Sequence, residues 1–234
     1  MKPTNPYLDS IINHPFPVLD HGSVTLLDYM GTELDIVRAA RVSTGHHGDL
    51  GKEATVRARI FDMMRKGHKT PFEMCEIKLH VKLPIFVARQ WVRHRTASIV
   101  EISGRFTDGL GEYYQPWPCQ DLLDEIQEER EFRKGQGDPN ERARILLPLS
   151  TYTEWVWKID ISNLLNFLEQ RLDDHAQWEI RQYAQIIAGM VENWLPVTWE
   201  AFREWRLDAV TIPASRAREL DQVFPEWKRL GVRP

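Results

Sequence analysis

The sequence predicts an α+β fold in a single domain, residues 1–234, in which helices outweigh strands. Over Ile77–Leu83 apolar residues alternate with charged or polar ones, which is typical of a strand with one buried and one solvated face. Over His175–Trp194 apolar residues recur every three to four positions, which predicts a long amphipathic helix. No Pro/Gly/Ser-rich linker is long enough to divide the chain between these patterns.

In the first part of the chain, a strand is predicted over Val24–Tyr29 and a helix over Thr32–Ala40. A second helix is predicted over Lys52–Lys66, because its apolar residues recur at helical spacing. Gly67 supplies the C-terminal stop of that helix, since glycine commonly follows the last helical turn.

Proline and capping residues predict the later boundaries. Pro84 is expected to be the first residue of a helix that runs to Trp91, because proline needs no N–H partner there. Asp174 and Gln177 offer a capping-box-like start to the helix from His175. The remaining predicted elements are an acidic helix over Asp121–Lys134, a loop over Gly135–Asn140, a strand over Tyr152–Ile159 and a short helix over Trp199–Arg206.

Composition restricts the class of protein. The net charge is -4, which argues against a generic nucleic-acid-binding protein, because such proteins carry a basic excess. No apolar run approaches the ~20 residues of a membrane span, and the first residues lack the apolar stretch of a signal peptide. The two cysteines, Cys75 and Cys119, form no C-x-x-C pair, which excludes a disulfide framework or a structural zinc site. We expect a cytoplasmic protein with no membrane or nucleic-acid partner.

Standard cofactor and metal motifs are absent from the sequence. Residues 67–70 (GHKT) lack the spacing of a phosphate-binding loop, and no G-x-G-x-x-G follows a predicted strand. There is no H-E-x-x-H or G-x-S-x-G, and the adjacent His46 and His47 cannot form an i, i+4 ligand pair. No metal ligands are expected.

Cationic and polar residues are concentrated in the segment Gln90–Phe106. The triplet Arg93–Arg95 (RHR) follows the helix that begins at Pro84, where cations also complement the helix dipole. In an extended chain Glu101, Ser103 and Arg105 share one face. Charge-assisted hydrogen bonds from such groups to anionic oxygens contribute about 1.5–3 kcal/mol each. The pattern favours a binding site for a phosphorylated ligand.

The triplet at 93–95 followed by Ser103 resembles the R-H-R-x7-S signature of the flavin-dependent thymidylate synthases. Other segments resemble that family in the same order: Ala40–Ser43 (ARVS), Gly67–Glu73 (GHKTPFE), Arg144–Leu149 (RILLPL) and Asn166–Arg181. The resemblance extends from Ala40 to Tyr183. It implies the family's fold, a mixed or antiparallel sheet flanked by helices.

The resemblance implies that the protein converts dUMP to dTMP. In this family 5,10-methylenetetrahydrofolate donates the carbon, and FAD reduced by NADPH supplies the hydride. Because the flavin carries the chemistry, no catalytic thiol is required, and we expect Cys75 and Cys119 to be buried or incidental. A homotetramer, in which several subunits contribute to each FAD site, is also implied.

The resemblance assigns roles to individual residues. Arg171 is expected to be catalytic, because it matches the arginine that stabilises the anionic form of the pyrimidine. The expected dUMP-binding residues are Gln90, Trp91, Val92, Arg93, Glu101, Ile102, Ser103, Gly104, Arg105, Arg144 and Arg171. The expected FAD-binding residues are Ser43, His68, Thr70, Arg93, His94, Arg95, Glu101, Asp160, Ser162 and Asn166. Ser103 is assigned a hydrogen bond to dUMP, since no general base can be assigned to activate it.

The chain departs from the family at a few positions. Asp160-Ile161-Ser162 stands where Asn-Ala-Arg is frequent, and Asp160 is also suited to cap a following helix. Phe106 and Met74 replace a usual tyrosine and a frequent histidine. Two alternatives stay open: a family member that binds nucleotide without turnover, and a nucleic-acid-binding module. The second would use Arg89, Arg93 and Arg95 around Trp91.

Overall fold

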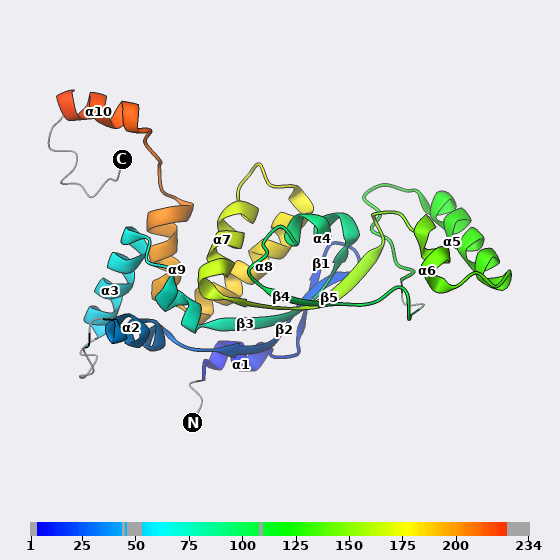
Figure 1. Cartoon of the computed structure of the whole chain (residues 1–234), viewed down its shortest axis with the longest axis horizontal. Helices are drawn as coiled ribbons and strands as arrows, with labels where there is room; N and C mark the ends of the chain where they lie inside the picture. The colour runs from blue at the N-terminus through cyan, green and yellow to red at the C-terminus, as the bar shows by residue number, and fades with distance from the viewer. Residues whose placement is uncertain (1–3, 44, 46–52, 108–109, 224–234) are drawn as a thin grey trace.

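The computed structural model describes residues 4–43, 45, 53–107 and 110–223. The described part of the chain contains one five-stranded sheet (Figure 1). Its strands lie in the order β1-β2-β3-β5-β4, and every neighbouring pair is antiparallel. The strands are β1 (Pro15–Val18), β2 (Gly22–Met30), β3 (Glu76–Pro84), β4 (Ser98–Glu101) and β5 (Tyr152–Asp160). The predicted α+β class is confirmed, as is the antiparallel sheet that the resemblance implied.

Thirteen described helical segments surround the sheet, and none of them is both long and apolar enough to cross a membrane. The α-helices are α1 (Pro6–Ile11), α2 (Glu33–Val42), α3 (Glu53–Lys66), α4 (Ile85–Trp91), α5 (Gln120–Gly135), α6 (Asn140–Ala143), α7 (Ile161–Arg171), α8 (Trp178–Trp194), α9 (Pro196–Phe202) and α10 (Ala214–Val223). Two short 3₁₀ segments, η1 (Thr70–Met74) and η2 (Arg144–Leu146), and one π-helix, η3 (Arg203–Leu207), complete the set.

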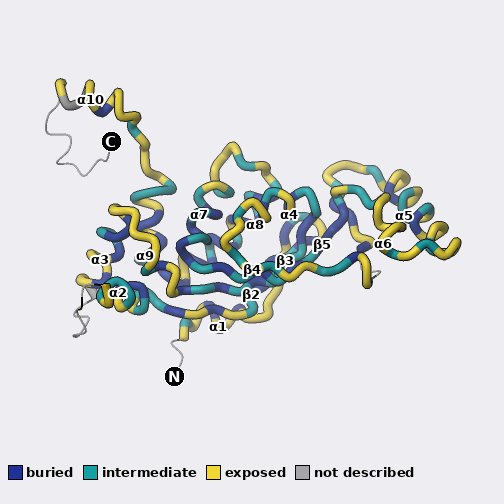
Figure 2. The backbone as a smooth tube through the Cα atoms, in the orientation of Figure 1, coloured by how far each residue is buried: buried dark blue, intermediate teal, exposed yellow. Residues whose placement is uncertain are grey.

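The core lies between the sheet and helices α4, α7 and α8, which run along one side of it in Figure 1. The predicted alternation in β3 and β5 places Leu79 opposite Trp157 and Val81 opposite Trp155, all of them buried. Trp91 from α4 packs edge-on against both tryptophans, at ring-centroid distances of 5.7 and 5.1 Å. Such aromatic pairs contribute about 0.5–1.5 kcal/mol each beyond burial. Figure 2 shows the buried residues concentrated in this layer.

The predicted elements of the first part of the chain are confirmed with small boundary changes. The strand predicted over Val24–Tyr29 lies within β2. Thr32 is the N-cap of α2 and forms a capping box with Asp35. Helix α3 ends before Gly67, whose φ of 70° is readily adopted by glycine. Lys52, the predicted start of that helix, lies outside the described residues.

Two predictions around β3 and β4 are wrong. Pro84 is the last residue of β3 and the N-cap of α4, with extended backbone (φ -64°, ψ 146°), because it still pairs with Tyr152. The extended face of Glu101, Ser103 and Arg105 does not form. The chain leaves β4 after Glu101, and the N–H of Phe106 bonds back to the carbonyl of Ser103, which turns the segment.

The later helices begin and end at different residues from those predicted. Helix α8 begins at Trp178 instead of His175, because Asp174 pairs with Arg181 and does not cap the helix. Helix α9 begins at Pro196, which is favoured in a first turn, and passes at residue 203 into a π-helix. The predicted acidic helix is confirmed as α5, and the predicted loop shrinks to residues 136–139 between α5 and α6.

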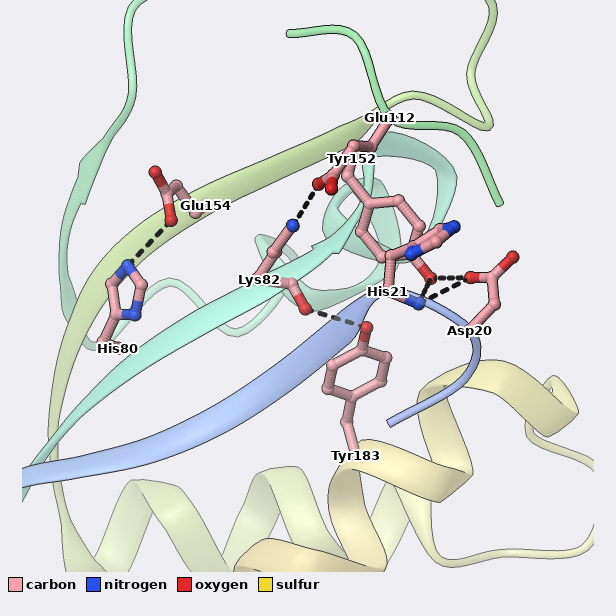
Figure 3. A network of polar contacts seen from close by, with 8 residues as sticks. All are labelled: Asp20, His21, His80, Lys82, Glu112, Tyr152, Glu154 and Tyr183. Atoms are coloured by element: carbon pink, nitrogen blue, oxygen red, sulfur yellow. Dashed lines mark hydrogen bonds and ion pairs between the residues drawn. The ribbon is translucent and has the colours of Figure 1, made fainter. Parts of the chain in front are cut away.

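Residues 116–149, which carry α5, α6 and η2, form an arm that stands away from the sheet (Figure 1). Two stretches join it to the core, residues 112–115 and 150–152, which we call the neck. They bond to each other where Tyr152 N–H donates to the Glu112 carbonyl at 2.8 Å. The side chain of Glu112 forms an ion pair with Lys82 of β3 (Figure 3). The arm is therefore fixed to the sheet at its base.

Asp20, in the turn between β1 and β2, holds both stretches of the neck (Figure 3). Its carboxylate accepts the Tyr152 hydroxyl at 2.5 Å and the Gln115 N–H at 3.0 Å. Burial acts to raise the pKa of Asp20, but these donors and the N–H of His21 outweigh it and hold that pKa below its ordinary value. Asp20 is therefore ionised and bonded at neutral pH.

Candidate active site

The end of α7 brings the predicted catalytic arginine against the segment that follows α4. Arg171 Nε donates to His94 Nε2 at 3.1 Å, and its Nη2 donates to the Gln90 carbonyl at 3.2 Å. The His94 ring also meets Phe167 edge-on at 5.0 Å, and Phe167 is fully buried. Arg171 is therefore in contact with Gln90, which was also predicted to bind dUMP, and with His94, which was predicted to bind FAD.

Burial sets the protonation states in this cluster. The pKa of His94 is lowered to about 4, mainly by burial and secondarily by the charge of Arg171. A neutral His94 that accepts a hydrogen bond at Nε2 carries its proton on Nδ1. Burial also lowers the pKa of Arg171 from a high ordinary value. The pair therefore holds one positive charge in a half-buried position, where it acts more strongly than in water.

Gln177 completes the cluster, and the sequence did not single it out for this role. Its side-chain oxygen accepts a hydrogen bond from the amide nitrogen of Gln90. Gln177 is the residue before α8 and makes no side-chain capping bond to that helix. The only sequence signal was its position inside the family-like segment 166–181.

A second cluster joins β4 to the returning end of the arm. Glu101 accepts the Thr153 hydroxyl at 2.6 Å, and Arg105 Nε pairs with Glu141 at 2.7 Å. Gly104 is buried, and a Cβ there would lie 3.4 Å from the Arg144 side chain, so the two residues are neighbours. The turn brings the predicted dUMP-binding residues of this segment beside Arg144, although not along an extended strand.

A third group lines a pocket of about 980 Å³. His68 and Ser162, both predicted to bind FAD, lie in its wall together with the apolar Phe72 and Leu165. The other wall comes from η3 and the residues after it, up to Ile212. Asn166, another predicted FAD-binding residue, accepts a hydrogen bond from Arg206 of η3 at 2.6 Å.

Other predicted residues lie outside these three groups. Among the described residues, no hydrogen bond or ion pair links the first cluster to the second. Trp91 is fully buried in the core, which leaves only its backbone for a ligand and argues against base stacking in a nucleic-acid-binding module. Ser43, Thr70, Val92, Arg93 and Arg95 are exposed and Ile102 is half-buried.

Asp160 acts as the cap of α7. Its Oδ1 accepts the N–H of Asn163 at 3.0 Å, and its Oδ2 accepts the Asn163 side chain at 2.7 Å. The capping role considered for Asp160 from the sequence is confirmed.

Neither cysteine has the surroundings of a nucleophile. Cys75 is buried, and burial raises the pKa of its thiol to about 12. Cys119 is partly exposed and follows Pro118 in the arm. Within the described ranges, no group of three His, Cys, Asp or Glu side chains is placed to hold a metal ion.

Comparison with known proteins identifies the family. Residues 25–197 match the family model described as thymidylate synthase complementing protein. A flavin-dependent thymidylate synthase from Gluconobacter oxydans is 41% identical, over 91% of this chain and 80% of the relative. The chain belongs to the flavin-dependent thymidylate synthase family. A second such enzyme, from Ruegeria pomeroyi, is 40% identical over 94% of this chain and 83% of its own length.

The fold of this chain also resembles that of a solved structure. The crystal structure of the UMP/dUMP methylase PolB from Streptomyces cacaoi, bound with 5-Br dUMP, matches with a TM-score of 0.73 and 27% identity. The match covers 80% of this chain and 96% of PolB. The flavin-dependent thymidylate synthase fold that the sequence resemblance implied is therefore the fold of this chain.

Proposed function

We propose that the protein catalyses the reductive methylation of dUMP to dTMP. In this proposal 5,10-methylenetetrahydrofolate donates the carbon, and FAD reduced by NADPH is the source of hydride. The observation that carries the proposal is the contact of Arg171 with His94 and with the Gln90 carbonyl. It places one confined positive charge beside the residues expected to bind the nucleotide.

The proposed role of Arg171 is to stabilise negative charge on the pyrimidine. The ring must become electron-rich at its 5-carbon before it can attack a methylene group. A preoriented guanidinium against the carbonyl and N–H edge of the ring favours that anionic form. Gln90, fixed by Gln177, is suited to orient the same edge through its side chain.

The nucleotide phosphate is assigned to the cluster between β4 and the arm. Arg105 and Arg144 supply guanidinium groups, which bind phosphate oxygens through paired N–H donors. Arg105 is paired with Glu141 on the surface, so binding a phosphate replaces an exposed ion pair, which contributes little. Ser103 and the backbone at Gly104 add hydrogen-bonding groups in the same turn.

The pocket that His68 and Ser162 line fits a flavin. It combines apolar wall residues with hydrogen-bond donors, including a buried Trp205 N–H that has no partner among the described residues. An aromatic ring system with polar edges requires such a mixed lining. When bound, FAD supplies the hydride chemistry, while the protein residues bind and orient it.

We also propose that the protein works as a cytoplasmic homotetramer with FAD sites shared between subunits. Large apolar side chains near the proposed nucleotide site are exposed in one chain: Val100 at 74%, Phe106 at 79% and Ile145 at 76%. Large apolar side chains exposed in one chain become buried where a protein interface covers them. Light scattering on the purified protein is expected to give the mass of four chains, and a monomer mass contradicts this part of the proposal.

The test of the reaction is dTMP formation by purified protein given dUMP, methylenetetrahydrofolate and NADPH, with FAD present or omitted. We expect product that depends on both FAD and NADPH. Bound flavin without product contradicts the proposed activity and favours a family member that binds nucleotide without turnover.

A further inference from the structure

The π-helix η3 lines the same pocket as His68 and Ser162. The N–H of Asp208 bonds to the carbonyl of Arg203 five residues earlier, at 2.9 Å, which is the hydrogen-bonding pattern of a π-turn. Short π-helical turns within helices occur frequently at functional sites. This turn places Trp205 and Arg206 in the lining of the pocket.

Arg206 has hydrogen-bonding capacity that the protein does not use. Its Nη2 donates to Asn166 and also to Glu169, and its side chain is only 22% exposed. In the described part of the chain, Nε and Nη1 have no hydrogen-bond partner. A guanidinium that is fixed by hydrogen bonds at one nitrogen and has unbonded N–H donors at the other two is preorganised to bind an anion.

Two neighbouring features support a polar ligand at this wall. The indole N–H of Trp205 is buried without a partner among the described residues, and a buried donor is normally bonded. The lining also carries the cations Arg65, Lys69 and Arg203, against the three carboxylates of Glu200, Glu204 and Asp208. Arg203, on the same π-turn, differs from Arg206, because it is 56% exposed and paired with Asp208.

We propose that Arg206 is a further flavin-binding residue, whose guanidinium binds the diphosphate of FAD from the π-helical wall. This inference rests on the proposed function, since it takes the pocket as part of the FAD site. The diphosphate is the anionic part of FAD, and riboflavin lacks it. Arg206 is therefore expected to discriminate FAD from riboflavin.

The experiment is calorimetric titration of the flavin-depleted full-length protein with FAD and with riboflavin. Arg206→Gln is expected to weaken FAD binding about tenfold and to change riboflavin binding less than twofold. Arg216→Gln is the control, because it removes the same charge from an ion-paired arginine of α10 that does not line the pocket, and its FAD affinity is expected to stay within twofold. Equal FAD affinity in Arg206→Gln and the unmodified chain overturns the assignment.

Two further variants distinguish direct binding of FAD by Arg206 from a structural role in which Arg206 only positions α7. Glu169→Gln removes the partner of Arg206 but keeps the cation, so FAD affinity is expected to stay equal or increase. If Glu169→Gln weakens FAD binding as much as Arg206→Gln does, Arg206 acts by bracing α7 and the assignment is wrong. Arg206→Lys keeps the positive charge but lacks the paired N–H donors of a guanidinium, so we expect a FAD affinity between those of Arg206→Gln and the unmodified chain. An affinity equal to that of either one contradicts diphosphate binding through both the charge and the paired donors.

The outcomes distinguish this inference from the proposed function. FAD binding by the unmodified chain, with no effect of Arg206→Gln, overturns the role of Arg206 alone. No FAD binding by the unmodified chain overturns both. Thermal unfolding of each variant verifies that a change in affinity is not a loss of fold.

Discussion

Burial lowers the pKa of both basic side chains that meet at the end of α7, His94 and Arg171. It lowers the pKa of His94 to about 4 and also lowers that of Arg171. The ordinary pKa of arginine is so high that Arg171 stays charged at neutral pH, whereas His94 becomes neutral. The contact therefore joins a cation to a neutral acceptor, and protonation of His94 would place two like charges 3.1 Å apart.

Replacing Arg171 by alanine is expected to reduce dTMP formation by at least about 100-fold while FAD stays bound, because the charge on the pyrimidine loses its stabilising donor. Turnover assays and the flavin absorbance of the purified variant measure the two effects. Arg181→Ala, which removes a surface partner of Asp174, is the control and should retain activity. Substantial dTMP formation by Arg171→Ala would contradict the catalytic assignment.

Acidification is expected to destabilise the protein through His94. Its folded pKa of about 4 lies below the ordinary 6.5, so between these values the unfolded chain binds a proton that the folded chain does not. Between pH 7 and pH 5 this lowers the free energy of unfolding by about 1–2 kcal/mol. Urea unfolding at both pH values should show that His94→Gln lacks this loss. His175→Gln, at a histidine 98% exposed, is the control; equal pH dependence in His94→Gln and the unmodified chain would refute the claim.

At the scale of elements, side-chain acceptors decide where helices begin. Thr32 and Asp160 each accept or exchange hydrogen bonds with the first turn of the helix that follows, and α2 and α7 begin directly after them. Asp174 has the same chemistry, but Arg181 takes its carboxylate and the helix begins four residues later. Sequence alone predicts the first two boundaries and misses the third, because an ion pair to Arg181 in the first turns of α8 competes with the cap.

Asp160→Ala is expected to lower the free energy of unfolding by about 1 kcal/mol, since two first-turn donors of Asn163 lose their acceptor. Chemical denaturation measures the loss. Asp160→Ser is the matched variant: it keeps an oxygen at the cap and should recover most of the stability. If Asp160→Ala and Asp160→Ser have the same free energy of unfolding, the cap contributes little.

At the scale of the whole molecule, a narrow neck carries an arm that holds part of the proposed nucleotide site. Asp20 lies far from Arg144 in sequence, yet it bonds both stretches through Gln115 and Tyr152. Tyr183 adds support from α8, because its hydroxyl donates to the Lys82 carbonyl at 2.9 Å. The same hydroxyl would lie 2.1 Å from a Cβ at position 22, so only glycine fits the adjoining turn.

Asp20→Asn is expected to loosen the arm, because an amide presents donors where Tyr152 and Gln115 also donate. Trypsin cleavage within the arm, at Arg133 or Arg142, should become about tenfold faster as the open form becomes more populated. Mass spectrometry of the fragments locates the cuts. Asp62→Asn removes a surface carboxylate from α3 and should leave the rate unchanged. Unchanged cleavage in Asp20→Asn would exclude this role.

The sequence predicted β2, β3 and β5 and most of the helices, because apolar residues recur there with the strand or helix period. It did not predict the four-residue strands β1 and β4, which are too short to show an alternation. It also named His94, Gln90 and Arg171, which lie 77 and 81 residues apart and meet in the structure. It did not predict the contacts of Arg206, because a π-turn follows no periodicity that a single sequence shows. Trp91 was placed at the site although its side chain is in the core, since a tryptophan in a helix looks the same in either role.

The strand order β1-β2-β3-β5-β4 has a consequence for synthesis of the chain. Strand β3 leaves the ribosome well before β5, the neighbour that covers its second edge. Until Tyr152 and the following residues emerge, the nascent chain presents an unpaired strand edge and an apolar sheet face that α7 and α8 have yet to cover. Such an intermediate is prone to aggregate and is a natural client for chaperones. Folding of the sheet therefore waits until β5, which ends at Asp160, has been translated.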